Sequence, residues 1–287
     1  MQGRVVGSIA LIAGLASCAT PQPLTPVELA QLDRRDALLG CCTEPGVGLS
    51  EGTILALEQA VPMVKLAARK TKFRESYLQT ATDAQDAIVA RARPLDVLIA
   101  RNGSRLSGSA GVGFFGHAQI YTGSEAELRS LGVWDHPAVA PHHAEIRAGA
   151  IGIEATEIGV HLSDRAKLFE VDTVALFRPR TLDRAARRRG VIRAFRMIGR
   201  PFDLDFDSSD PARVSCTELV EMAVPELGLP VQRFLARDVT VPDAVAAHAL
   251  AGRVPMDLLV FIQGYPVGWR LRDEDDMAAL ILGAWPR

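Results

Sequence analysis

The spacing of hydrophobic and polar positions changes at about residue 94 of this 287-residue chain. Before that point apolar residues recur every three or four positions, which predicts helices between Pro26 and Arg93. After it, short apolar runs are separated by glycine-rich and polar stretches, which predicts strands. We expect these strands at residues 96–100, 117–121, 150–155 and 173–177, with a further one from Leu258 onward.

Two helices with clear boundary signals accompany these strands. Residues 182–198 are rich in arginine and are followed by Gly199 and Pro201, which is typical of a helix C-terminus. A second amphipathic helix begins at Cys216, after an acidic loop at residues 203–210. Because strands and helices do not alternate regularly, the pattern predicts an α+β fold.

The first residues indicate export. An apolar stretch at residues 5–15, too short to span a bilayer as a mature helix, ends in Leu15-Ala16-Ser17-Cys18. This ending resembles the bacterial lipoprotein box, which implies that Cys18 is lipidated, becomes the mature N-terminus and anchors the protein to a membrane. Ala19 in place of aspartate implies the periplasmic side of an outer membrane. The alternatives are an ordinary signal peptide and a buried apolar N-terminus.

The chain therefore divides into three expected parts. Residues 1–18 form the signal peptide, residues 19–93 a tether and a helical region, and residues 94–287 a single α+β domain. Thr25 and Pro26 are suited to the cap and first turn of the first helix. The formal net charge of -2 gives no sign of a nucleic-acid partner.

The chain has 4 cysteines, and Cys18 is already assigned to the lipid. Cys41 and Cys42 are adjacent, and because adjacent cysteines bridge poorly we do not expect a disulfide between them. Cys216 is then the expected free thiol. No cysteine spacing is typical of a zinc site, and we expect neither a metal nor a cofactor.

Cys216 has the setting of a reactive cysteine. A thiol at a helix N-terminus lies near the positive end of the helix dipole, which favours the nucleophilic thiolate. A cysteine hydrolase also needs a histidine and a group that orients it. His117 opens one predicted strand and Glu154 lies on the next, where neighbouring strands can place them side by side. The alternative is that Cys216 is a small buried hydrophobic residue.

A series of motifs runs in order from Leu95 to Val220. They are Leu95-Asp96-Val97-Leu98-Ile99, Phe115-Gly116-His117-Ala118, Gly152-Ile153-Glu154-Ala155, Gly159-Val160, Phe177-Arg178-Pro179, Gly199-Arg200-Pro201-Phe202-Asp203-Leu204-Asp205-Phe206 and Ser215-Cys216-Thr217-Glu218-Leu219-Val220. The series resembles the permuted papain-like amidases, the YiiX/YebB-type members of the NlpC-type cysteine peptidase superfamily. The chain departs from the family at four positions: Leu95 stands for glycine, Gly116 for a hydroxyl residue, Gly152 for valine or isoleucine, and Ser215 for tyrosine.

The resemblance implies a circularly permuted papain-like fold with a helical extension at its N-terminus. It also implies that Cys216 is the nucleophile, His117 the general base and then acid, and Glu154 the group that orients His117. Tyr121 lies on the same strand face as His117 and either lines the site or packs in the core. We expect Asp203 to contact a cationic group of the substrate.

These features together predict a lipid-anchored cysteine hydrolase of the cell envelope that cleaves an amide, such as one in a peptidoglycan stem peptide. One alternative is a lipid-directed acyltransferase or thioesterase of the same fold. Another is a binding or scaffolding lipoprotein without catalysis. The cluster of His136, His142 and His143 favours a surface loop over a zinc site, and the aspartates of residues 203–210 lack the glycine and glutamate of a calcium loop.

Overall fold

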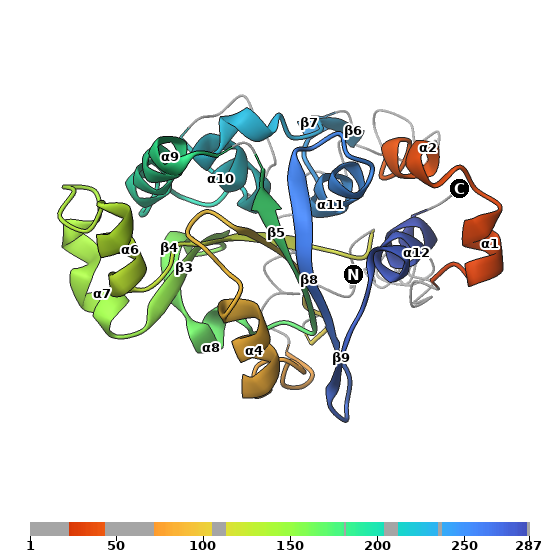
Figure 1. Ribbon diagram of the computed structural model, residues 1–287, viewed down its shortest axis with the longest axis horizontal. Helices are drawn as coiled ribbons and strands as arrows, with labels where there is room; N and C mark the ends of the chain where they lie inside the picture. Colours follow the sequence, from red (N-terminus) through yellow and green to blue (C-terminus); the bar gives the residue numbers. More distant parts are fainter. Residues whose placement is uncertain are drawn as a thin grey trace, which may run out of the picture.

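The computed structural model describes residues 23–43, 72–104, 113–180, 182–203, 212–234 and 237–285. In this part of the chain a seven-stranded sheet has the order β4-β3-β2-β1-β5-β8-β9, and each neighbouring pair is antiparallel. The sheet and its flanking helices confirm the α+β class (Figure 1). The strands are β1 Val97–Arg101, β2 His117–Tyr121, β3 Ala150–Thr156, β4 Gly159–Asp164, β5 Thr173–Pro179, β8 Met256–Gly264 and β9 Trp269–Leu271, with a separate hairpin of β6 Gln232–Phe234 and β7 Arg237–Val239.

Helices lie on both sides of the sheet. In Figure 1, α9, α10 and α11 lie above it and α4 and α8 below it. The helices are α1 Pro26–Ala30, α2 Arg34–Leu39, α4 Thr82–Val89, α6 Glu125–Leu131, α7 His143–Arg147, α8 Arg165–Leu168, α9 Arg184–Arg196, α10 Cys216–Ala223, α11 Pro242–Leu250 and α12 Glu274–Ala284, with 3₁₀ turns η1 Ala140–His142 and η2 Pro225–Leu227.

Strand β1 shows why the sheet is covered on both faces. Val97 and Ile99 belong to the apolar cluster that includes α9 to α12, whereas Leu98 and Ala100 belong to the cluster with α4 and α8. Successive side chains point to opposite faces of a strand, so a continuous apolar run fits a strand buried on both sides. Each fully buried leucine or isoleucine contributes about 1.5–3 kcal/mol.

Most predicted elements lie where the pattern places them, and β2 has the expected bounds. Two elements that position the site were not predicted. Strand β4 alternates apolar and polar residues from Val160 to Ser163, but the run is short and was not recognised. Helix α11 is buried around most of its circumference, so its alanine-rich sequence has no amphipathic period to recognise.

The N-terminal helices pack on the C-terminal part of the chain. Thr25 caps α1 in a capping box with Glu28, which confirms the predicted helix start. The Leu24 N–H donates to the Ala279 carbonyl at 3.0 Å, and α2 packs against α11 and α12. Cys41 and Cys42 form a disulfide, so the expectation that they stay unpaired is wrong. Cys42 adopts φ of 70°, a left-handed conformation, in this adjacent pair. Among the described cysteines, Cys216 is the free thiol.

Several sequence predictions lie outside the described residues. These are the signal peptide with Cys18, residues 44–71 of the predicted helical region, and residues 204–210 of the acidic loop. Within the described ranges, no helix has the length and apolar character needed to cross a bilayer.

Candidate active site

Cys216 is the first residue of α10, and only 7% of its surface is exposed. Ser215 is the N-cap: its Oγ accepts from the Glu218 N–H, and the Glu218 carboxylate accepts from the Ser215 N–H at 2.7 Å. This reciprocal capping box defines the helix start. The sulfur therefore lies in the first turn of α10, where the helix dipole stabilises a thiolate.

Helix α10 packs against β2 and β3, the strands that carry His117 and Glu154. His117 Nε2 lies 2.8 Å from Glu154 Oε2. The strand register places Gln119 directly opposite Glu154, so His117 reaches the carboxylate diagonally rather than as its direct cross-strand partner. Long side chains span this diagonal readily.

The Cys216 thiol lies close enough to the His117 imidazole to raise the pKa of His117. Because Glu154 holds Nε2, the other ring nitrogen, Nδ1, remains for the thiol. The structure thus brings together three residues from β2, β3 and α10 that are 37 and 62 positions apart in consecutive steps along the chain. His117 lies between the thiol of Cys216 and the carboxylate of Glu154.

Glu154 has three further partners that sequence reasoning missed. Gln119 Nε2 donates to its Oε2 at 3.2 Å, Ser163 Oγ donates to its Oε1, and His161 Nε2 lies 3.7 Å from Oε1. Strand periodicity carries a signal for them, because Gln119 follows His117 by two positions and His161 is the cross-strand partner of Glu154. These contacts hold both oxygens of the Glu154 carboxylate in place.

The electrostatics of the pair favour charged His117 and charged Glu154. Burial raises the pKa of Glu154, but the hydrogen bond and charge of His117, with Ser163 and His161, lower it to about 2. Burial lowers the pKa of His117, but the hydrogen bonds and charges of Cys216 and Glu154 raise it to about 10. A protonated imidazole between a carboxylate and a sulfur is the partner that a nucleophilic cysteine needs.

The His117 shift predicts how stability depends on pH. The pKa of His117 is about 10 in the folded protein and about 6.5 in an unfolded chain, so its stabilising contribution is complete below about pH 6.5 and is lost as pH rises through about 10. We expect urea unfolding between pH 7 and pH 10 to show a falling free energy of unfolding in the wild type. The His117→Gln variant should show a smaller fall, and equal slopes for the two proteins would contradict the assigned interaction.

The approach of α10 to the sheet depends on close backbone packing next to β4. The Val160 N–H donates to the Arg200 carbonyl at 2.9 Å, and the Gly199 N–H donates to the Val160 carbonyl at 2.8 Å. Gly159 has φ of 96°, and a Cβ there would lie 2.5 Å from the Arg200 carbonyl oxygen, so the contact requires glycine. Phe202 then bridges to Val214, two residues before Cys216.

The two predicted substrate-binding residues lie in different surroundings. Tyr121 is buried in the cluster with α4 and α8, and its hydroxyl donates to Glu127 Oε2 at 3.0 Å. This placement matches the alternative in which Tyr121 is a core residue. Asp203 is buried, and its backbone N–H donates to the Val214 carbonyl at 3.3 Å, which places it beside the segment that leads into Cys216.

The histidine-rich loop forms structure of its own. His143 stacks on Trp134 and its Nε2 donates to the Trp134 carbonyl at 2.9 Å, while His142 Nδ1 lies 3.0 Å from Glu145 Oε1. His136 Nδ1 accepts from the Ala138 N–H. Across the described ranges, no three histidine, cysteine, aspartate or glutamate residues are grouped to hold a metal ion.

Comparison of the chain with known protein families, with curated proteins and with solved structures finds no match.

Proposed function

We propose that this protein is a cysteine hydrolase of the permuted papain-like type that cleaves an amide bond. The observation that carries the proposal is the connected set of Cys216 at a helix N-terminus, His117 beside it and buried Glu154 behind His117. This is the arrangement of nucleophile, base and orienting group that thiol-dependent acyl transfer needs.

The chemistry follows from the three roles. The Cys216 thiolate forms a bond to the amide carbonyl carbon, and backbone N–H groups in the first turn of α10 stabilise the charge on the carbonyl oxygen. The C–N bond breaks, and protonated His117 gives its proton to the leaving amine. Water then gives a proton to His117 while its oxygen bonds to the thioester carbon. The C–S bond breaks, which releases the acid and restores the thiolate.

Glu154 keeps His117 competent in both steps. Its Oε2 fixes Nε2 of the ring, which leaves Nδ1 for proton exchange with the thiol, the leaving amine and water. Because Gln119 and Ser163 also hold the carboxylate, the ring is oriented by a rigid partner. Removing such an orienting group in related triads costs a large part of the rate.

The local structure bears on three departures from the family motifs: the family residue would fit at Leu95 and Gly116, and Leu168 takes its place at Gly152. Leu95 has φ of 73°, the left-handed conformation for which the family glycine is suited. A Cβ at Gly152 would lie 2.5 Å from Leu168 Cδ1, so the space of the family's larger residue is filled by Leu168. A Cβ at Gly116 meets no atom within 4 Å, so a hydroxyl residue would fit there.

The proposed location is the bacterial cell envelope, with the lipid on Cys18 as the anchor and a peptidoglycan stem peptide as the substrate. The disulfide between Cys41 and Cys42 supports an oxidising compartment. The backbone contact of Leu24 with α12 leaves only a short stretch between the proposed anchor and the folded domain.

Alkylation of Cys216 tests the proposal without knowledge of the substrate. We expect iodoacetamide to modify Cys216 rapidly at pH 6, where an ordinary thiol of pKa about 8.5 is almost fully protonated and reacts slowly. Without reductant the disulfide protects Cys41 and Cys42, so mass spectrometry of the Cys216 peptide reports the site directly.

Two histidine variants make the comparison specific. His117→Gln should slow the alkylation at pH 6 by about tenfold or more, because the cationic partner of the thiolate is lost. His142→Gln changes a histidine that pairs with Glu145 outside the site and should leave the rate unchanged. A slow reaction of Cys216 in the wild type would favour the non-catalytic binding lipoprotein.

A further inference from the structure

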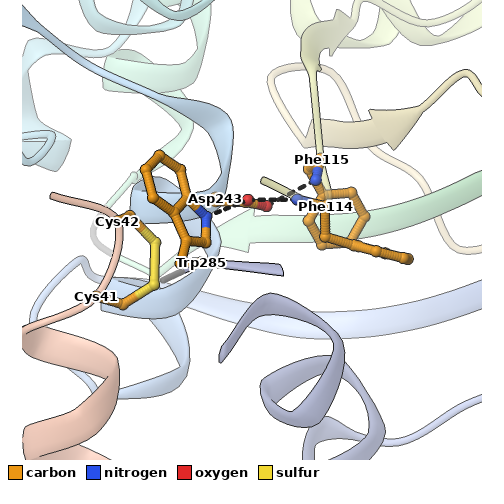
Figure 2. The surroundings of a disulfide bond; sticks show 6 residues. All are labelled: Cys41, Cys42, Phe114, Phe115, Asp243 and Trp285. Atoms are coloured by element: carbon orange, nitrogen blue, oxygen red, sulfur yellow. Dashed lines mark hydrogen bonds between the residues drawn. A yellow bond between two sulfur atoms is a disulfide. The ribbon is translucent and has the colours of Figure 1, made fainter. Parts of the chain in front are cut away.

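Asp243 is a buried carboxylate that the proposed reaction does not use. It lies in the first turn of α11, only 1% exposed, between Trp285 and the segment that contains Phe114 and Phe115 (Figure 2). Burying a carboxylate is costly unless hydrogen bonds compensate for the lost water. The burial of this carboxylate therefore calls for a structural reason.

Both carboxylate oxygens are fully engaged, and two of the three donors are backbone groups. Asp243 Oδ2 accepts from the Phe114 N–H at 2.6 Å and from Trp285 Nε1 at 2.6 Å, and Oδ1 accepts from the Phe115 N–H at 2.7 Å. Two consecutive backbone N–H groups held by one carboxylate fix both the position and the direction of the chain at this point.

We call the contact of Asp243 with the Phe114 and Phe115 N–H groups the Asp243 clamp; Phe115 lies two residues before His117. The Gly116 N–H donates to the Ala100 carbonyl at 3.1 Å, which joins the clamped segment to the sheet. Arg101 Nη1 donates to the Phe114 carbonyl at 3.0 Å, so the same peptide is held from its other side. Gly113 has φ of 100°, and a Cβ there would collide with Asp243 Oδ2, so the chain passes directly over the carboxylate.

Trp285, the third donor to Asp243, is also held in place by its surroundings. The Trp285 ring is buried in the same apolar cluster as Cys41 and Cys42, and Figure 2 shows the ring between the disulfide and Asp243. The indole N–H is thereby directed at the carboxylate. Asp243 is consequently supported by α11, by Trp285 and by the cluster that contains the disulfide.

We propose that Asp243 is a positioning residue of the active site, which holds the segment Gly113–Gly116 so that His117 lies between Cys216 and Glu154. The inference rests on the proposed function. It assigns to a residue 126 positions after His117 the task of fixing where β2 begins. Burial raises the pKa of Asp243 to about 6, despite the donors and Arg101 that lower it. An asparagine there would avoid that cost but could not accept from all three donors.

Titration of the His117 imidazole by NMR tests the inference in the full-length protein, with the His117 signal assigned by its loss in His117→Gln. In Asp243→Asn the ring should move away from Cys216 and Glu154, and the pKa of His117 should fall by at least about one unit from its raised wild-type value. Trp285→Phe, which keeps both backbone bonds to Asp243, should lower that pKa by a smaller amount and serves if Asp243→Asn does not fold.

The matched control is Asp96→Asn. Asp96 is also buried and accepts from the Arg93 N–H and Arg178, but its carbonyl accepts from the Tyr121 N–H, at the end of β2 away from His117. The Asp96→Asn variant should leave the pKa of His117 unchanged. An unchanged pKa in Asp243→Asn, or an equal fall in Asp96→Asn, would overturn the inference. The alkylation rate of wild-type Cys216 decides the proposed function separately, because the His117 titration does not depend on catalysis.

Discussion

Replacing Cys216 with alanine should lower amide cleavage by at least about 10⁴-fold, because the nucleophile of a triad contributes most of the catalysis. In the proposed mechanism no other described thiol can replace it, since Cys41 and Cys42 are joined in a disulfide. The measurement is release of products from soluble peptidoglycan fragments, followed by mass spectrometry with wild-type and variant protein.

The fold should survive this change. Alanine keeps the first position of α10, and the cap formed by Ser215 and Glu218 does not involve the thiol. The matched control is Glu221→Gln on the same helix, which should retain wild-type turnover. If the Cys216→Ala variant cleaves the fragments at the wild-type rate, the hydrolase proposal is wrong.

Replacing His117 with alanine should lower turnover by about 10⁴-fold, close to the effect of removing the nucleophile. Two losses combine: the proton can no longer pass to the leaving amine, and the cation that stabilises the thiolate is absent. The remaining kcat/KM of the variant should be very low at acidic pH and should rise only at alkaline pH. The reason is that the Cys216 thiol must then ionise without the His117 cation.

The double variant Cys216→Ala with His117→Ala distinguishes a catalytic pair from two independent residues. Residues that act as one unit are strongly non-additive, so the double variant should be about as inactive as Cys216→Ala alone. Effects that multiply fully would show that the two residues do not act on the same step.

The positions of most strands and of α9 and α10 could be predicted from the sequence because their signals are local. An apolar run such as residues 97–100 or a capped amphipathic helix at Cys216 needs only its own neighbours to be recognised. The residues that carry the proposed chemistry could also be recognised in the sequence. Few other side chains can serve as nucleophile, general base and orienting group.

The diagonal contact of His117 and Glu154 could not be predicted in the same way. It depends on the register of β2 against β3, which pairs Gln119 with Glu154. A shift of that register by one residue would turn every side chain to the other face. Strand periodicity limits the candidates but does not select the register, which is set by packing of the whole sheet.

The Asp243 clamp gave no sequence signal at all. Its donors from Phe114 and Phe115 are backbone N–H groups, which every residue except proline carries. Helix α11 has no amphipathic pattern, since most of its circumference is buried. The disulfide of Cys41 and Cys42 was not expected for a different reason, because adjacent cysteines bridge poorly.

The sequence alone therefore determined the α+β class, the positions of most elements and the three residues of the proposed triad. Only the tertiary structure decided which of these residues meet, which groups support Glu154, and how the chain before His117 is held. The physical reason is the distance along the chain over which each kind of signal acts. Periodicity and capping act over a few neighbouring residues. Strand register and the burial of Asp243 depend on contacts between distant segments, 35 positions apart for Gln119 and Glu154 and 129 positions apart for Phe114 and Asp243.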